Sequence, residues 1–579
     1  MTNVDPPEPQ PIVLTTINAR HSHAALGLRY LKANAGPLAE RIAIVELVLG
    51  ADVETMARRL LGVLAPRPPR IIGLGVYVWN VVASTALAAR LRELAPDAVL
   101  VAGGPEVSHE LEQQPIAALV DYVVQGPGDL AFARLATAIL NGPRPLQRVI
   151  SGDQPADLGE LVLPYPLYDA HDIARRHLYV EASRGCPFKC AFCLSALDRT
   201  AWPFPVPPLL SALDDLHRRG ARRFRFVDRT FNLRLADSAR ILEFFLERIT
   251  AQPDDPCFVH FELIPDRLPP ALREPIARFP PGTLQFEIGI QTFDPEVQRS
   301  IDRRQDNAAA EANLRWLRAE THAHLHVDLI AGLPGEGLAG FAAGYDRLRA
   351  LRPHEIQLGL LKRLRGAPII RHENAGRLVF EPVAPYRVTR TDALSECEIA
   401  EFEHIARVHD RVVNSGRMPE LAAAVLDSGS SAAGPAPATA PDISVSAFAR
   451  LRALSAALVK RFGRSHGIGL EPLVDAVREF AVDSGLVESD RATAMAIADY
   501  RRCGAHGRLN CMARGLTSSR PNSEAFAPAA TVVPAERTPD SDGMLTRRSP
   551  GVGGIRLAAC EPAAALPRQR RHRRKREVV

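Results

Sequence analysis

Apolar residues in the first 150 positions come in five short runs, each long enough for one strand and rich in Val, Ile and Leu. The runs are PIVLTTI (11–17), RIAIVEL (41–47), RIIGLGVYV (70–78), DAVLVAGG (97–104) and DYVVQG (121–126). Such runs are typical of parallel strands covered by helices on both faces. Helical patterns follow the first four runs, beginning near Ala24, Val53, Val81 and His109. We therefore predict a doubly wound, Rossmann-like α/β domain over residues 11–155, with its ligand at the carboxyl ends of the strands.

Residues 172–380 repeat a different unit, in which a strand alternates with a helical segment. The candidate strands are LYVEAS (178–183), RFRFVD (223–228), CFVHFEL (257–263), TLQFEIGI (283–290), HLHVDLIAG (324–332) and EIQLGLL (355–361). The helical patterns cover 209–219, 235–249, 308–320 and 341–351. This alternation predicts a second parallel sheet. Chemistry gathers at the carboxyl ends of such strands, which draws attention to Asp228, Glu287, Gln291 and Asp328.

The remaining chain has weaker patterns. Residues 381–512 have helical periodicity and are interrupted by a low-complexity linker at 428–441, so we expect a helical extension there. Residues 513–579 are rich in Pro, Ser, Ala and Arg without periodicity, and we predict a disordered basic tail. The tail contains RQRRHRRKR (568–576), but the net charge of the whole chain is only +5. We therefore expect a solvated tail and no nucleic-acid partner.

Three of the eight cysteines lie within eight residues, in the segment GCPFKCAFC. Cys186, Cys190 and Cys193 have the spacing C-x3-C-x2-C. The opening residues MTNVDPPEPQ have no basic stretch before an apolar core, and no window holds 18 uninterrupted apolar residues. We therefore predict a cytoplasmic protein without a membrane segment. In a reducing compartment, clustered cysteines more often bind metal or do redox chemistry than form disulfides.

The number of cysteines distinguishes between metals. Structural zinc usually takes four protein ligands, whereas the next cysteine after this group is Cys257 and no histidine follows nearby. Three thiolates suit a [4Fe-4S] cluster that leaves one iron open for another ligand. Gly185 and Pro187 favour a turn around the cluster, and Phe192 places an aromatic ring beside it. A structural zinc site is the alternative.

The cysteine pattern, with an aromatic residue before the last cysteine, resembles the radical S-adenosylmethionine (SAM) superfamily. This resemblance implies a partial (β/α)6 barrel over residues 172–380 and SAM bound at the open iron of the cluster. It also implies that reduction of SAM releases a 5'-deoxyadenosyl radical, with electrons from an external donor such as flavodoxin or ferredoxin. Cys186, Cys190 and Cys193 would be the cluster ligands, and Phe192 would lie in the cofactor site.

Other stretches of the same region resemble further patterns of this superfamily. EIGIQTFDPEV (287–297) is similar to its fourth-strand E-x-G-x-Q-[ST] stretch, which implies that Glu287 and Gln291 face SAM or the substrate. HVDLIAGLPGE (326–336) is similar to its fifth-strand turn, which implies cofactor contacts from Asp328, Gly332, Pro334 and Gly335. Asp228 stands where many members have a glycine-rich turn near the SAM amino group. For each single carboxylate, a helix cap or a surface ion pair is the alternative.

No GxGxxG follows the first strand, which disfavours a dinucleotide ligand. A Rossmann-like domain placed before a radical SAM barrel resembles the cobalamin (B12)-binding radical SAM proteins. VAGGPEVSHE (101–110) and VVQGPGD (123–129) are similar to loops of that subfamily. The resemblance implies cobalamin contacts from two loops and from the end of the third run. The residues concerned are Tyr77, Asn80, Gly103, Gly104, Pro105, Gly126 and Gly128.

The loop NARHSHAALG (18–27) lacks the D-x-H-x-x-G arrangement that supplies a lower axial ligand in another branch of B12 proteins. The resemblance therefore implies a cobalt with no protein histidine below it, and His21 and His23 have the alternative of ordinary loop positions. The segment that begins PYRVTRTDALSECEIAEF, at Pro385, resembles an uncharacterised extension of some members of the subfamily.

The resemblance implies three cofactors: a [4Fe-4S] cluster, SAM and cobalamin. The reaction it implies is methyl transfer to an unactivated carbon or phosphorus of a small-molecule or natural-product substrate. Two alternatives stay open, namely a non-methylating rearrangement or oxidation and a corrinoid-binding carrier or sensor without catalysis. The sequence does not specify the substrate.

Overall fold

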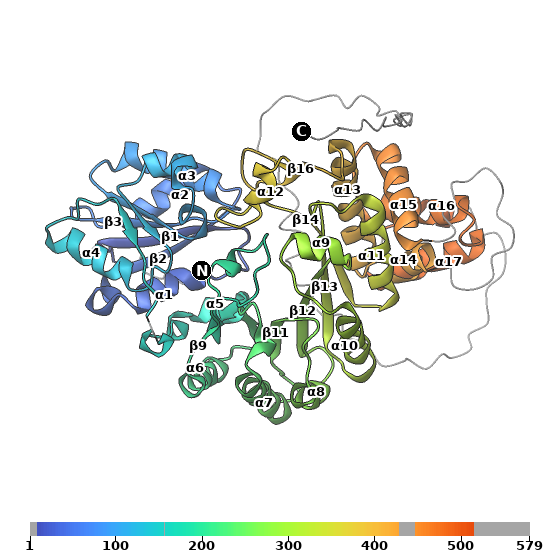
Figure 1. Ribbon diagram of the computed structural model, residues 1–579, viewed down its shortest axis with the longest axis horizontal. Coiled ribbons are helices and arrows are strands. Elements are labelled where there is room, and N and C mark those ends of the chain that lie inside the picture. The colour runs from blue at the N-terminus through green and yellow to red at the C-terminus, as the bar shows by residue number, and fades with distance from the viewer. Residues whose placement is uncertain (1–7, 156, 428–445, 506, 514–579) are drawn as a thin grey trace, which may run out of the picture. The chain divides into compact units, whose positions relative to one another are not determined.

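The computed structural model describes residues 8–155, 157–427, 446–505 and 507–513, and its ribbon is drawn in Figure 1. The predictions for the linker at 428–441 and for the tail beyond 513 lie outside the described residues. The predicted α/β class is confirmed by two six-stranded sheets, one after the other along the chain. Among the described helices, none is long and apolar enough to cross a bilayer.

The first sheet belongs to the N-terminal domain and has the strand order β2-β1-β3-β4-β5-β6. All its pairings are parallel. Its strands are β1 (Ile12–Asn18), β2 (Ile42–Val48), β3 (Ile71–Gly75), β4 (Val99–Gly103), β5 (Tyr122–Gln125) and β6 (Val149–Ser151). The reversal of order between β1 and β3 is the switch point of a doubly wound sheet, where ligands bind. The short edge strand β6 was not expected from the sequence.

Helices cover both faces of this sheet (Figure 1), and they are α1 (Leu26–Ala33), α2 (Val53–Leu61), α3 (Val81–Leu94) and α4 (Ala131–Asn141). Alternate residues of β1 point into two separate apolar clusters, Val13 into one and Leu14 into the other. The helix predicted near His109 was wrong. Three short 3-10 turns stand there (Pro105–Val107, Leu111–Gln113 and Pro115–Ala118), because proline interrupts an α-helix and disfavours helical backbone in the residue before it.

The second sheet has the order β14-β13-β12-β11-β10-β7, with every pairing parallel, and it contains all six predicted strands. They are β7 (Leu178–Val180), β10 (Arg223–Phe226), β11 (Phe258–Leu263), β12 (Leu284–Gln291), β13 (His324–Ala331) and β14 (Glu355–Leu360). Strands β7 and β14 stay unpaired with each other in this order, so the barrel is incomplete.

Helices flank the barrel strands and are α5 (Ala170–Arg175), α6 (Val206–Arg218), α7 (Leu235–Ala251), α8 (Pro270–Ala277), α9 (Pro295–Ser300), α10 (Asn307–Glu320) and α11 (Leu338–Ala350). Helix α8 was not predicted, because Pro275 lies inside it and disguises the helical pattern. Along β12, Phe286 and Ile288 are buried whereas Glu287 and Gly289 are partly exposed. One face of this sheet therefore packs on helices while the other is polar.

The C-terminal extension shares a continuous apolar core with the barrel. Its elements are α12 (Ile370–Asn374), β15 (Leu378–Phe380), β16 (Val388–Thr391), α13 (Glu396–His409), a π-helical turn (Asp410–Asn414), α14 (Pro419–Leu426), α15 (Ala447–Phe462), α16 (Leu470–Asp483), α17 (Ser489–Arg502) and α18 (Asn510–Ala513). Helix α15 contacts both α11 and α13, and α13 contacts β14 (Figure 1).

The extension also covers the open edge of the barrel sheet. The side chain of Asn414 donates to the carbonyl of Ile356 (2.9 Å) and accepts from its N–H (3.3 Å). These two bonds replace the missing neighbour of β14, because an edge strand otherwise leaves such groups unpaired.

Candidate functional site

The three clustered cysteines lie on the loop that follows β7, at the carboxyl end of the barrel sheet. Cys186 and Cys190 are buried and Cys193 is partly exposed. The residue after Cys190 is held from two sides, because the N–H of Ala191 donates to Ile301 (2.8 Å) and its carbonyl accepts from the N–H of Ile369 (2.7 Å). Segments distant in the sequence therefore fix the shape of this cysteine loop (186–193).

The positions of the sulfur atoms test which metal group fits. A single zinc ion with bonds of about 2.3 Å draws its sulfur ligands to about 3.8 Å of one another. Among the described residues, the three cysteines do not form a group whose donor atoms all lie within 4.8 Å. The thiols are nevertheless close enough to influence one another. Burial raises the pKa of Cys186 to about 11, and the charges of Cys193 and Cys190 add to this rise. Three neighbouring thiols without a fourth protein ligand fit a [4Fe-4S] cluster with one open iron better than a structural zinc ion.

Arg303 is a residue of this site that the sequence analysis missed. Its Nη1 lies 3.6 Å from the Sγ of Cys190, and its guanidinium also donates to the carbonyl of Gly289 and to the side chain of Gln305. Burial raises the pKa of the Cys190 thiol, and the charge of Arg303 opposes that rise. No local motif marks Arg303, because 113 residues separate it from Cys190.

The structure brings Glu287 and Asp328 together on the polar face of the barrel sheet. Glu287 pairs with His260 (3.3 Å) and Asp328 with His326 (3.3 Å). A third carboxylate, Glu262, was not predicted and pairs with Arg229 (2.9 Å). Burial raises the pKa of Glu262 to about 7. The charge of Arg229 opposes this rise, and repulsion from Glu287 and Asp328 adds to it. Such crowding stores negative charge where a cationic group can bind.

Gln291 has the backbone geometry of a specialised position. It adopts φ +67°, at a bulge where the register between β12 and β13 shifts. Its side chain lies over Gly289, since a Cβ there would stand 2.3 Å from the Gln291 Nε2. The buried Oε1 of Gln291 has no hydrogen-bond partner. The backbone strain and the open acceptor mark Gln291 as an unusual position, and its contact with SAM or substrate stays a prediction.

Asp228 is occupied by the protein itself. Its two oxygens accept from the N–H of Ala182 (2.9 and 3.1 Å) and from the hydroxyl of Ser183 (2.6 Å). Burial raises the pKa of this carboxyl to about 7 against these hydrogen bonds. Asp228 thus supports the chain just before the cysteine loop, and a direct contact with SAM stays a prediction.

The glycines of the GLPG turn and Phe192 make contacts within the protein. Gly332 has φ +85°, and a Cβ there would lie 2.5 Å from the Val388 side chain of β16. The N–H of Gly335 donates to Asp392 (2.9 Å), next to Pro334. Phe192 packs, partly buried, against the main core. The close approach that requires Gly332 is therefore to the β15–β16 hairpin.

Two loops of the N-terminal domain lie side by side at the carboxyl ends of β4 and β5. Ser108 connects them, since its hydroxyl donates to the carbonyl of Gly104 (2.9 Å) and accepts from the N–H of Gly126 (3.0 Å). Pro105 begins a 3-10 turn, and a Cβ on Gly103 or Gly128 would meet Val124 at 3.6 Å or Leu31 at 3.3 Å. The sequence predicted both loops but not Ser108.

Asn80 and Gly104 serve the fold of this loop region. Asn80 is fully buried and donates to the Ile17 and Gly75 carbonyls and to Thr16 (3.1 to 3.2 Å). A Cβ on Gly104 would lie 2.5 Å from the carbonyl oxygen of Val76. Both residues therefore shape the ends of β3 and β4, and contacts of their own with cobalamin stay predictions.

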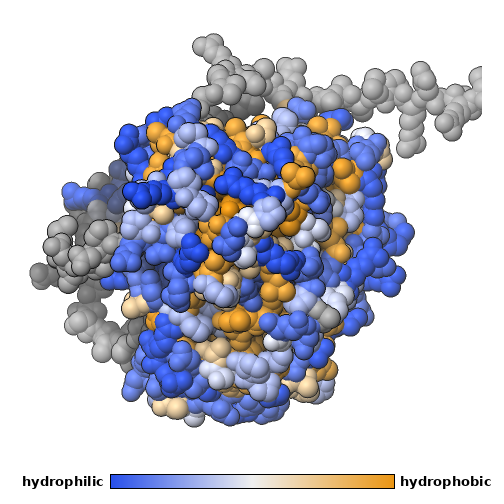
Figure 2. All heavy atoms as spheres, turned by 90° about the vertical axis from the view of Figure 1, so that its left-hand side faces the viewer, coloured by the Kyte–Doolittle hydropathy of each residue, from blue (hydrophilic) through white to orange (hydrophobic). Residues whose placement is uncertain are grey.

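Aromatic residues follow β3 at the switch point of the sheet. Tyr77 and Trp79 stack with ring centroids 4.4 Å apart, and Trp79 is 43% exposed. Figure 2 views the molecule from the side of the N-terminal domain and shows apolar side chains gathered among charged ones on this face. A stacked aromatic pair that is open to solvent can cover one face of a flat ligand.

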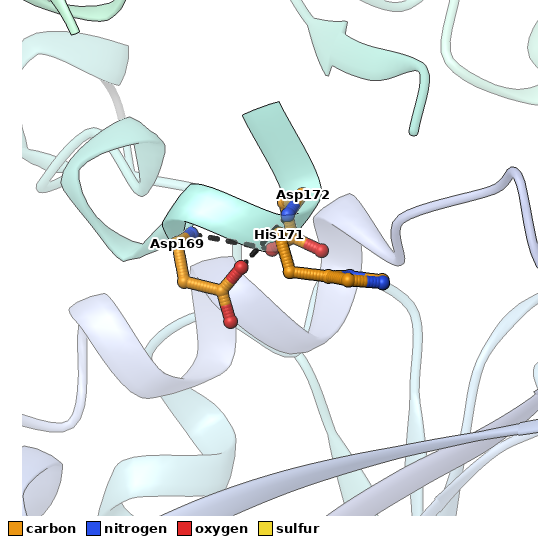
Figure 3. A group of neighbouring side chains, drawn as sticks. All are labelled: Asp169, His171 and Asp172. Carbon is orange, nitrogen blue, oxygen red and sulfur yellow. Dashed lines mark hydrogen bonds between the residues drawn. The ribbon is translucent and has the colours of Figure 1, made fainter. Parts of the chain in front are cut away.

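The two loop histidines contact the barrel region. Nδ1 of His23 lies 2.5 Å from the Tyr179 hydroxyl, and the ring of His21 meets His171 edge-on. His171 also belongs to the group Asp169, His171 and Asp172 shown in Figure 3, whose donor atoms lie within 4.8 Å. The dashed bonds there form the capping box of α5, and Asp172 is paired with Arg29 (2.5 Å). Helix capping and ion pairing account for this group.

Comparison with known proteins identifies the barrel. Residues 180–347 match the model of the radical SAM superfamily. This part of the chain is a radical SAM domain.

The cobalamin-dependent radical SAM methyltransferase TokK of Streptomyces tokunonensis is 25% identical over 331 residues, covering 51% of this chain and 47% of TokK. The 2-(S-pantetheinyl)-carbapenam-3-carboxylate methyltransferase of Streptantibioticus cattleyicolor is 25% identical, covering 50% and 46%. The chain spans about half the length of these curated relatives.

Solved structures resemble the radical SAM domain together with its neighbours. The cobalamin-dependent SAM radical enzyme OxsB superposes with a TM-score of 0.52 at 13% identity, over 86% of this chain and 84% of OxsB. The radical SAM methyltransferase TsrM from Kitasatospora setae gives 0.50 at 19% identity, over 64% and 77%. At these identities the likeness shows a shared fold. A doubly wound domain before a radical SAM barrel is therefore an arrangement that this chain shares with such enzymes.

Proposed function

We propose that this chain is a cobalamin-dependent radical SAM enzyme that transfers a methyl group to an unactivated carbon or phosphorus of a small molecule. The observation that carries the proposal is the contact between the two sets of loops. Arg184, two residues before Cys186, donates to both oxygens of Asp129, next to Gly128 (2.8 and 3.2 Å). Two ligand-binding loop regions of different folds meet here, as a reaction with two cofactors requires.

Cys186, Cys190 and Cys193 are the residues that would hold a [4Fe-4S] cluster, with one iron left for SAM. When bound, this cluster supplies the electron that cleaves SAM to a 5'-deoxyadenosyl radical. Arg303 offers a guanidinium beside Cys190, which suits the carboxylate of SAM. The carboxylates Glu262, Glu287 and Asp328 suit its positive and hydroxyl groups. Gln291, with its unsatisfied oxygen, orients the same ligand.

The loops after β3, β4 and β5 would hold cobalamin, whose chemistry here is to carry the methyl group. Tyr77 and Trp79 offer a flat apolar surface, and Gly103, Pro105, Gly126 and Gly128 leave backbone accessible. Ser108 and Asn80 hold these loops in shape.

The substrate class follows from the relatives by analogy. The names of TokK and of the carbapenam methyltransferase specify methyl transfer, and the latter acts on a small acid. We extend this to the present chain as a small-molecule or natural-product substrate, with an external electron donor such as flavodoxin or ferredoxin and a cytoplasmic location.

The test is to reconstitute the protein anaerobically with iron, sulfide and hydroxocobalamin, then to supply SAM and a reductant. We expect a corrin absorbance band that co-elutes with the protein and formation of 5'-deoxyadenosine. With a methyl acceptor, S-adenosylhomocysteine should appear near one to one with 5'-deoxyadenosine, because each turnover needs one radical and one methyl group. 5'-Deoxyadenosine without S-adenosylhomocysteine would indicate a rearrangement or oxidation instead. Corrin binding without SAM cleavage would indicate a carrier or sensor.

A further inference from the structure

The loop after β4 is fastened to the segment that follows the last barrel strand. Glu110 ends this loop, and its carboxylate accepts from Arg363 (2.7 Å), Arg365 (2.9 Å) and the N–H of Gly366 (3.1 Å). The hydrogen bonds keep the pKa of Glu110 below its ordinary value although burial acts to raise it. The side chains of Arg363 and Arg365 are only 10% and 7% exposed, so water competes little for these bonds.

Backbone geometry shows that this contact is specific. Glu110 adopts a left-handed conformation with φ +50°, which costs energy for a residue with a Cβ. Gly366 has φ +82°, and a Cβ there would lie 2.4 Å from the ring of His109. The loop after β4 and the segment after β14 therefore fit together because Glu110 is left-handed and because residue 366 is glycine.

The same segment reaches the cysteine loop three residues later. The N–H of Ile369 donates to the carbonyl of Ala191 (2.7 Å), which lies between Cys190 and Cys193. Residues 363–369 thus contact the loop after β4 at one end and the cysteine loop at the other. We call the bonds of Glu110 to Arg363, Arg365 and Gly366 the first clamp.

A second clamp holds the other loop of the N-terminal domain, the one after β5. Arg184 donates to both oxygens of Asp129 and also to Glu181 (2.8 Å), and its guanidinium lies 4.7 Å from the ring centroid of Tyr30. Asp129 and Glu181 are buried, at 6% and 7% exposure. Arg184 is joined to Cys186 through Gly185 alone, so this clamp also leads to the cysteine loop.

We infer that Glu110 and Asp129, with their partners Arg365 and Arg184, are positioning residues that hold the two cofactor loops of the N-terminal domain in register with the cysteine loop. This inference rests on the proposed function, since register matters only if both domains carry a cofactor for one substrate. The clamps act on either side of the cysteine loop, one from Arg184 before Cys186 and one through Ile369 and Ala191. Together they join the two domains at two places beside the cysteine loop.

The first experiment measures register without any cofactor. Nitroxide labels are attached through a genetically encoded azide at the exposed residues Leu146 in the N-terminal domain and Leu235 in the barrel. Pulsed EPR on the full chain should give one narrow distance distribution. In Glu110→Gln/Asp129→Asn it should broaden or shift, because the neutral side chains no longer attract the three arginines of the clamps. In the control Asp97→Asn, which breaks an ion pair with Arg70 inside the N-terminal domain, it should stay unchanged.

The second experiment uses the reconstituted protein. In the double variant, iron content and 5'-deoxyadenosine formation should stay at wild-type levels, because both substitutions lie outside the residues that would hold the cluster and SAM. Corrin content is measured alongside, and the product ratio is compared per bound corrin. The yield of S-adenosylhomocysteine per 5'-deoxyadenosine should fall by about tenfold or more, since a misplacement of about 1 Å can cost about 100-fold. If the double variant does not fold, Arg184→Lys/Arg365→Lys keeps both charges, removes the forked geometry and should give the same uncoupling.

The outcomes separate this inference from the proposed function. An unchanged distance distribution in the folded variants would overturn the inference, and so would a changed distribution with an unchanged product ratio. A wild-type protein that binds no corrin would overturn the proposed function, and with it the inference about coupling, whatever the labels show.

Discussion

Nη1 of Arg303 lies 3.6 Å from the Sγ of Cys190, although 113 residues separate them in the sequence. Arg303 follows α9, whereas Cys190 belongs to the loop after β7. The same guanidinium donates to the carbonyl of Gly289, whose neighbour Gln291 carries an unsatisfied oxygen. Arg303 therefore connects the cysteine loop to the polar face of β12.

We predict that Arg303→Gln keeps its cluster but loses about 100-fold in the rate of SAM cleavage, because Arg303 is a partly buried charged donor beside Cys190 and one such donor to a reacting ligand contributes about that much. Its exposed neighbour supplies the matched control, and Arg304→Gln should cleave SAM at the wild-type rate. Iron analysis and 5'-deoxyadenosine formation measure the two effects. A loss of iron in Arg303→Gln would mean that Arg303 supports the loop rather than SAM.

Removal of one cysteine should separate the cluster ligands from the other thiols. Reconstituted wild-type protein should hold about four irons per chain. Cys190→Ala should lose the cluster and all SAM cleavage, whereas Cys503→Ala should keep both, because Cys503 lies at the end of α17 and donates to the Arg417 carbonyl. A full, reducible cluster in Cys190→Ala would contradict the assignment of the cysteine loop.

Two adjacent glycines at the end of β4 should respond differently to alanine. A Cβ on Gly104 would lie 2.5 Å from the Val76 carbonyl oxygen, and its φ of +108° is itself unfavourable for alanine. We expect Gly104→Ala to lower the free energy of unfolding by about 1–3 kcal/mol. Gly103→Ala, whose Cβ would meet its nearest atom at 3.6 Å, should cost less than about 1 kcal/mol. Urea denaturation compares them, and equal losses would refute the steric explanation.

The C-terminal extension contains a histidine that should make stability depend on pH. His409, the last residue of α13, is fully buried with its ring edge-on against Tyr345 of α11, and neither ring nitrogen has a hydrogen-bond partner. Burial, then the charge of Arg349, lowers its pKa to about 3, while Glu355 acts in the opposite direction.

Between pH 6.5 and 3, the unfolded chain protonates this histidine while the folded chain does not. Stability contributed by His409 is therefore present above pH 6.5 and lost as the pH falls, by about 1.4 kcal/mol per pH unit. We predict that His409→Phe removes this share of the slope in urea denaturation between pH 7 and pH 5. His466→Phe, at a histidine outside this core, should keep the wild-type slope.

Much of the fold and part of the candidate site follow from local sequence. Apolar runs placed the five expected strands of the first sheet and all six of the second, because a buried parallel strand needs a continuous apolar stretch. The cysteine loop was also visible in the sequence, because Cys186, Cys190 and Cys193 lie within eight residues of one another. Where local rules compete, the sequence misled, and prolines turned the expected helix near His109 into 3-10 turns and concealed α8.

Only the tertiary structure decided which polar residues meet and what they do. The side chains of Asn80 and Asp228 bond the ends of neighbouring strands, and the ligand contacts expected for them stay predictions. No sequence signature marks Arg303, Ser108 or the clamp between Glu110 and Arg365. In the clamp, for example, Arg365 bonds residues that lie 252 to 255 positions away in the chain. Periodicity records how each segment buries its own apolar face. The partner of a charged side chain depends on how the chain folds back, and that is a property of the whole core.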